Sequence, residues 1–346
     1  MELKSVTDQS NEVFWLHYLR IAACLGVIWL HLIPSAYSDE YSAWFISILK
    51  GLAVWPVPVF VMVSGAVNLA PFKTDDITAF YRKRMKRILP PLVFWSFVFL
   101  GIRAVDQYRD WGSVDGSSLL HLLLMGRPST HLWFLFMIPG LYLSAPFLST
   151  LLNHYSERIL LAAVGIGFLL ISLNDLVQRF WFGAGDLWCI RFIKFIPFFC
   201  SGYLFLRGRF VEKIPYWIVW AVLIISFGLG LWGTRFVMSN PEQSRQLVFL
   251  SRYSVFMTLT ALSIYLVFQK TVIFHRPVGL IRRLSSLTFG IYVIHPLLIR
   301  LLREFSCLSD PVRLIFYMIP ATLGIFVLSC IAVYGISKIP VLKHTV

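Results

Sequence analysis

Two ionisable residues, Arg20 and His31, lie within the first long apolar stretch of the chain, which runs from residue 13 to residue 34. On an α-helix at about 100° per residue, the eleven steps between them return to within roughly 20° of the starting direction. The rise of about 1.5 Å per residue separates them by about 16 Å along that face. Ionisable side chains inside a membrane span are costly and normally face a bundle interior or a wet cavity. The pair therefore predicts a polar path, where an imidazole can take a proton from an attacking hydroxyl.

Each candidate histidine also has a structural interpretation. His31 fits a cap on the interfacial turn before Pro34, although its register with Arg20 favours the chemical role. His295 is a second histidine within an apolar stretch, with Tyr292 one helical turn before it. That pair is compatible with a place beside the reacting groups and equally with a hydrogen-bonded structural role.

A basic run precedes another apolar stretch. Arg84 and Arg87 are three residues apart on one helical face, and Arg82 and Lys83 lie beside them. Guanidinium groups bind phosphate through paired hydrogen bonds, so the run predicts a site for a phosphorylated cofactor that arrives from the cytosol. An anchor on lipid headgroups explains the same run equally well.

Two further groups have open interpretations. Arg191 and Lys194 form an i, i+3 pair in an apolar stretch, where they suit an anionic acceptor, a lipid pyrophosphate, or simple snorkelling to the interface. Tryptophans that include Trp133 suit stacking on sugar rings, but aromatic belts at membrane interfaces are common.

The composition defines the elements that must position these residues. Hydrophobic residues make up 58% of 346 positions and charged residues 14%, and the mean hydropathy is +0.74. A soluble domain has about 25% charged residues, so we expect an all-α integral membrane protein with a bundle of about ten transmembrane helices. The expected spans are residues 13–36, 43–70, 87–106, 131–152, 157–175, 187–207, 214–236, 248–270, 286–304 and 312–338.

The charge pattern predicts the topology. Basic clusters recur in alternate connecting segments, whereas the segment 35–42 has Asp39 and Glu40 and neither Lys nor Arg. By the positive-inside rule both termini are cytoplasmic, residues 1–12 form a cytoplasmic tail, and residues 107–130 form an extracytoplasmic loop with a short surface helix. The net charge of +14 then reflects topology, and nucleic-acid binding explains it poorly.

Other features of the chain bound its organisation. The five cysteines have no paired spacing, so neither a disulfide framework nor a metal site is expected. Residues 1–346 are expected to form a single membrane domain with no appended soluble domain. Pro56 and Pro58 remove backbone donors and predict a broken helix, which membranes tolerate only beside protein or a cavity.

Five segments in order carry a resemblance to a known family. They are residues 15–22 with His31, 58–65, 84–90, 131–135 with 142–146, and 286–296. Together they resemble the acyltransferase-3 family, and within it the short bacterial membrane proteins that O-acetylate surface polysaccharides or their lipid-linked units, of the enterobacterial common antigen and O-antigen type. The resemblance implies acetyl-CoA as donor, a glycan or lipid-linked glycan acceptor, and a place in the bacterial inner membrane.

The resemblance also assigns roles to residues. It implies that Arg20 and His31 are essential and that Arg84 and Arg87 lie near the CoA site, with Arg82 and Lys83 as neighbours. The remaining candidates for substrate contact or support are Ser64, His131, Trp133, Tyr292, His295 and Arg191.

One departure and one rival interpretation stay open. Family members usually have Asp three residues before the first arginine, and this chain has His17, so Arg20 must be oriented another way. A transporter or flippase of a lipid-linked sugar or small molecule would also suit many spans, a proline-broken helix and an intramembrane Arg/His pair.

Overall fold

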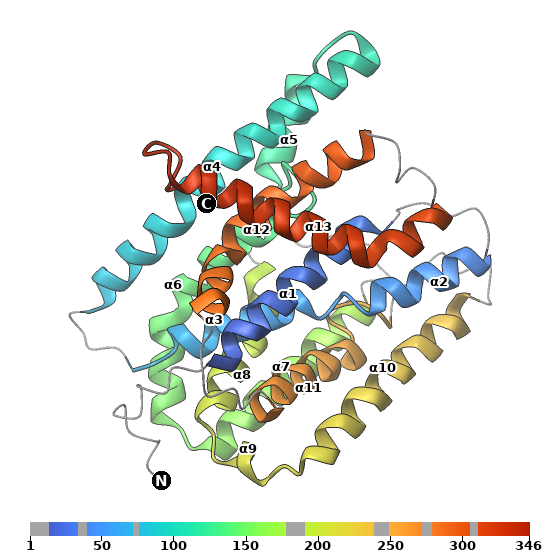
Figure 1. Ribbon diagram of the computed structural model, residues 1–346. Coiled ribbons are helices and arrows are strands. Elements are labelled where there is room, and N and C mark those ends of the chain that lie inside the picture. The colour runs from blue at the N-terminus through green and yellow to red at the C-terminus, as the bar shows by residue number, and fades with distance from the viewer. Residues whose placement is uncertain are drawn as a thin grey trace.

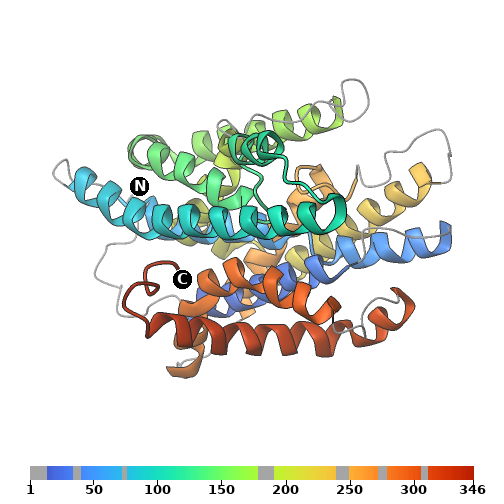
Figure 2. The same ribbon diagram turned by 90° about the horizontal axis from the view of Figure 1, so that it is seen from above.

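The computed structural model describes residues 14–33, 40–71, 76–177, 191–238, 249–271, 279–304 and 311–346. In these ranges the chain is a bundle of helices without strands, which confirms an all-α integral membrane protein (Figure 1). Turned by 90°, the long helices run broadly along one direction (Figure 2). The expected tail, residues 1–12, lies outside the described residues, as does Asp39.

The described residues form thirteen α-helices and one 3₁₀ helix. In chain order they are α1 (Phe14–Leu32), α2 (Glu40–Gly51), α3 (Pro56–Asn68), α4 (Asp76–Trp111), α5 (Gly116–Leu124), α6 (Trp133–His154), α7 (Glu157–Val177), the 3₁₀ helix η3 (Arg191–Phe195), α8 (Ile196–Arg207), α9 (Phe210–Lys213), α10 (Tyr216–Met238), α11 (Val255–Thr271), α12 (Gly279–Glu304) and α13 (Pro311–Ser337).

Among the described residues, eight segments are long and apolar enough to cross a membrane. They match eight of the ten expected spans. The other two expected spans fall on η3 with α8 and on α11, whose helices are shorter. Length and composition alone therefore support eight crossings within the described ranges.

The proline-broken helix is present. α2 ends at Gly51 and α3 begins at Pro56, and the second expected span is thus divided into two helices. The indole N–H of Trp55 donates to Leu52 O at 2.9 Å across the break. The break packs directly on α1, because a Cβ built at Gly26 would lie 2.6 Å from Pro56 Cγ.

The third expected span extends further than its apolar residues. α4 has 36 residues and continues to Trp111, so the first residues of the stretch expected as a loop are helical. Gly112 ends the helix at φ +67°, where its N–H donates to Tyr108 O. The expected surface helix is α5, capped by Asp115. Hydrogen bonds from Ser117 and Ser118 lower the pKa of that carboxyl.

α1 holds the bundle together. It contacts α3, α11, α12 and α13, and its residues Leu19, Ala23 and Ile28 are fully buried. α12 runs beside α1 in the same direction, since His17 pairs with Ser285 near the start of both helices and His31 lies beside His295 further along. Residues at equal height on these two helices therefore face each other.

α3 and α8 cross at two glycines. A Cβ at Gly65 would lie 1.8 Å from Phe199 O, and a Cβ at Gly202 would lie 1.9 Å from Met62 O. Both obstacles are backbone atoms that cannot rotate away. Small residues let helices approach this closely inside membranes, so the crossing fixes the distance between α3 and α8.

We expect Gly65→Ala and Gly202→Ala to wedge the two helices apart and to cost about 1–3 kcal/mol of folding free energy, the range for overpacking a core. Thermal unfolding of the purified protein in detergent measures the change. Gly165→Ala in α7 is the matched control, because nothing lies within 4 Å of its Cβ. Equal melting temperatures for all three variants would contradict the close crossing.

Candidate active site

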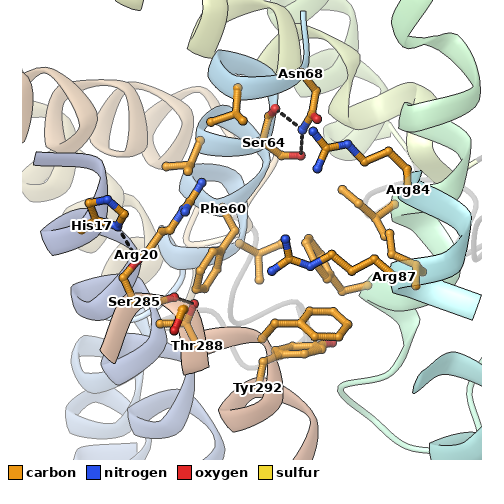
Figure 3. Close-up of a pocket in the computed structure, with 18 of the residues that line it drawn as sticks. His17, Arg20, Phe60, Ser64, Asn68, Arg84, Arg87, Ser285, Thr288 and Tyr292 are labelled. Atoms are coloured by element: carbon orange, nitrogen blue, oxygen red, sulfur yellow. Dashed lines mark hydrogen bonds between the residues drawn. The ribbon is translucent and has the colours of Figure 1, made fainter. Parts of the chain in front are cut away.

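A cavity of about 400 Å³ lies among α1, α3, α4, α6 and α12, and we call it the arginine cavity (Figure 3). The side chains of Arg20, Arg84 and Arg87 extend into it from α1 on one side and from α4 on the other. Arg282 also contributes to the wall. The described residues that line the cavity include neither Asp nor Glu, so the cavity has a surplus of positive charge and suits an anionic ligand.

The α4 side of the arginine cavity is held by aromatic rings and a hydrogen-bond chain. The guanidinium of Arg84 lies 5.5 Å from the centre of the Phe80 ring and 5.8 Å from that of Tyr142. Ser64 Oγ donates to the Tyr142 hydroxyl at 3.1 Å, and Asn68 Nδ2 donates to Ser64 O at 2.7 Å. Within the described part of the chain, Arg84 Nε and Asn68 Oδ1 are buried without a hydrogen-bond partner, as expected of groups that a ligand completes.

The α1 side shows what replaces the usual acid. His17 also lines the cavity, and its Nδ1 lies 3.0 Å from Ser285 Oγ. Ser285 O in turn accepts a hydrogen bond from Thr288 Oγ1 at 2.8 Å. The residue at the acid position thus ties α1 to α12 and adds no negative charge beside Arg20.

A second cavity of about 380 Å³ contains His31, and we call it the His31 cavity. Arg300 and Asp106 form a paired ion contact across it, with both N–O distances at 2.6 Å. Arg303 donates to His31 O at 3.2 Å. The end of α1 is therefore fixed to α12, and α12 is fixed to α4.

His31 lies beside two other histidines, His131 and His295. The ring centres of His31 and His295 are 5.2 Å apart, those of His31 and His131 are 6.2 Å apart, and those of His131 and His295 are 5.5 Å apart. His131 and His295 are 1% and 0% exposed. Over the described part of the chain, no three His, Cys, Asp or Glu side chains are placed to hold a metal ion.

Tyr292 separates the two cavities. It lines the arginine cavity, its ring lies 5.6 Å from that of His131, and its hydroxyl donates to His131 O. Val27 lines the same cavity, and His31 follows four residues later, one turn along α1. The single path expected along α1 is thus two cavities, which approach each other from opposite sides of this wall.

Comparison with known proteins identifies the chain. A model of the acyltransferase-3 family, described as an acyltransferase domain, matches residues 13–333. The chain belongs to the acyltransferase-3 family. No curated protein and no solved structure matches it. Its membership and its apolar helices make it a multi-pass membrane acyltransferase.

An acyltransferase needs two sites, one for the donor and one for the acceptor. The arginine cavity and the His31 cavity are two spaces of similar volume that meet at one wall. Of the residues expected from the sequence, Arg20, Arg84, Arg87, Ser64 and Tyr292 line the first of these spaces. His31 lines the second, and His131 and His295 lie next to it.

Other expected residues of this acyltransferase lie elsewhere. Arg82 and Lys83 are exposed on α4 and do not line the arginine cavity. Arg191 is buried, and its guanidinium lies 5.7 Å from the centre of the Trp133 ring, while that of Arg252 lies 4.5 Å from the same ring. These three residues form a cation–aromatic stack that lines neither cavity.

Sequence reasoning missed several wall residues of the acyltransferase. Asp106 and Arg300 lie near the ends of long helices, where single charges look like interface anchors. Asn68 and Tyr142 are ordinary polar residues in apolar helices. The signal for Asp106 was its i, i+3 spacing to Arg109, a pair now separated by 3.9 Å.

Proposed function

We propose that the chain is an O-acetyltransferase of the bacterial inner membrane. It moves an acetyl group from cytoplasmic acetyl-CoA to a hydroxyl of a cell-surface polysaccharide or its lipid-linked sugar unit. The observation that carries the proposal is the arginine cavity, which is free of acidic residues in its described lining and ends one helical turn from His31.

The donor suits the arginine cavity by charge and by polarity. Coenzyme A carries a diphosphate and a 3′-phosphate, and Arg84 and Arg87 offer the paired donors that phosphate prefers. The cavity wall beyond them is largely apolar, with Val57, Val63 and Ile138 among its residues. In the proposal this part holds the pantetheine arm, and the thioester lies at the wall formed by Tyr292.

The acceptor enters from the His31 cavity. Its hydroxyl gives its proton to His31 while the oxygen attacks the thioester carbonyl carbon. The carbon–sulfur bond breaks, and the thiolate leaves and takes up the proton, so that an ester and a free thiol result. Tyr292 moves aside as the two substrates meet. An acetyl-imidazole on His31, formed by direct attack of the ring on the thioester, is the alternative route.

The donor site is tested by binding. We expect Arg84→Gln and Arg87→Gln each to weaken acetyl-CoA binding by about tenfold or more, because one lost charge-assisted contact is worth about 1.5–3 kcal/mol. Equilibrium binding of radiolabelled acetyl-CoA to the protein in detergent measures the change. Lys86→Gln is the matched control, since Lys86 is exposed on the same helix and outside the cavity. An equal loss in Lys86→Gln would argue for general electrostatic attraction instead of this site.

The reaction is tested by transfer. Membranes that contain the wild type should move radiolabel from acetyl-CoA into a lipid or glycan fraction, and His31→Gln should lose this activity by about 100-fold or more, the contribution of a general base. His121→Gln, a change on exposed α5, should retain it. Label found on His31 itself after a brief reaction without acceptor would favour the acetyl-imidazole route.

A carrier has no use for the donor. If expressed wild-type protein neither binds acetyl-CoA nor transfers label from acetyl, succinyl or longer acyl donors to a range of acceptors, the proposal fails. Transport of a lipid-linked sugar would then be measured.

A further inference from the structure

One ring nitrogen of His295 has no hydrogen-bond partner among the residues that the structure describes. His295 is 0% exposed, and its Nε2 is buried without a hydrogen bond. A buried polar atom left in this state destabilises the fold, because it has lost its hydrogen bonds to water and gained none in return. Such atoms are rare in native structures and call for an explanation.

The partner of the other nitrogen defines the chemistry of this ring. His295 Nδ1 lies 3.1 Å from Ile291 O. A carbonyl oxygen only accepts hydrogen bonds, so Nδ1 carries the proton in the neutral ring and Nε2 has a free lone pair. The unpartnered atom is therefore a hydrogen-bond acceptor, and a donor must complete it.

His131 does not supply that donor. Its Nε2 lies 3.3 Å from Val293 O and donates there, and its Nδ1 lies 3.0 Å from Ser129 Oγ and accepts from it. Both nitrogens of His131 are thus occupied, and its main-chain oxygen accepts from Tyr292. His131 is a fixed neighbour of the cluster.

The ring of His31 lies at a distance from the ring of His295 that suits a hydrogen bond between the two. Its ring centre lies 5.2 Å from that of His295, with 51° between the ring planes. The ring centres of two imidazoles are about this far apart when a nitrogen of one ring lies about 3 Å, a hydrogen-bond distance, from a nitrogen of the other. Catalytic hydrogen bonds are often open in unliganded enzymes and close when substrate binds.

We propose that His295 is the positioning residue of His31: its Nε2 accepts a hydrogen bond from one ring N–H of His31 whenever that ring turns toward it, as it does in the reacting complex. This bond fixes the tautomer of His31 and leaves its other ring nitrogen bare toward the His31 cavity. The inference rests on the proposed function, because it assigns the partner of the base in that reaction.

The proton path follows from this arrangement. The acceptor hydroxyl gives its proton to the bare nitrogen of His31, which becomes an imidazolium. The second N–H of that imidazolium remains bonded to His295 Nε2, so His295 stays neutral throughout. When the carbon–sulfur bond breaks, His31 returns a proton to the thiolate.

Two substitutions at residue 295 separate acceptor chemistry from packing. The amide oxygen of His295→Gln can take the place of Nε2 as an acceptor, whereas His295→Leu fills the space without one. We expect His295→Leu to lower kcat about 100-fold with the acetyl-CoA KM within about twofold of wild type, and His295→Gln to keep kcat within about tenfold. A purely structural role predicts equal losses in both variants.

A second readout does not depend on acyl transfer. Diethyl pyrocarbonate acylates the bare nitrogen of a neutral imidazole, and mass spectrometry reports the rate at each histidine. His31 opens to its own cavity, so the reagent reaches it. We expect slower labelling of His31 in His295→Leu by about fivefold or more, near wild-type labelling in His295→Gln, and unchanged labelling of exposed His121 in both.

The two readouts distinguish failure of the inference from failure of the proposed function. Equal effects of the Gln and Leu substitutions on kcat and on His31 labelling, in proteins with wild-type melting temperatures, would overturn the role of His295. A wild type without transfer activity whose His31 labelling still depends on residue 295 would sustain the pairing and reject the acetyl-transfer reaction. Should His295→Leu fail to fold, His295→Met provides the same test with a flexible side chain.

Discussion

The structure depends on the need to bury ionisable side chains on one central helix. α1 carries Arg20 and His31 into the interior of a bundle whose outer surface is apolar, and lipid offers no partners for them. Both residues lie on cavities between helices and away from the apolar exterior. The apolar turn between them, with Val27 and Ile28 buried, packs against Tyr292 and its neighbours. A single helix therefore carries charged or ionisable groups into two cavities, with an apolar segment between them.

The backbone around α1 is built to let other helices reach these spaces. The break before Pro56 packs on Gly26, so α3 begins beside α1 and directs Ser64 and Asn68 toward Arg84. The glycine crossing then lets α8 close behind α3 at backbone contact distance. Neither feature takes part in the proposed reaction, yet both determine where the polar side chains of α3 lie. Irregular backbone at membrane depth is tolerated because it borders protein and a cavity.

Local signals in the sequence predicted much of this arrangement, and the rest depends on tertiary contacts. Apolar length gave the long helices, and the two prolines gave the break between α2 and α3. The same signals missed the extension of α4 to Trp111, because its polar last turns are helical without being apolar. The helical spacing of Arg84 and Arg87 predicted that they share one face, and both line the same cavity. The spacing alone could not show that Arg82 is exposed and lies outside that cavity. The meeting of three histidines from α1, α12 and the turn before α6 has no sequence signal, since only packing brings them together.

The choice of neighbour for His31 follows from the cost of burying charge. A carboxylate buried behind the base would need its own hydrogen bonds and counter-charge, and such an ion is expensive away from water. Within the described lining of the His31 cavity the one carboxylate is that of Asp106, and both of its oxygens accept hydrogen bonds from Arg300. A neutral imidazole supplies a hydrogen-bond acceptor at a smaller desolvation cost. The unpartnered nitrogen of His295 destabilises the fold modestly, and this cost is relieved when His31 turns into the geometry that the reaction requires.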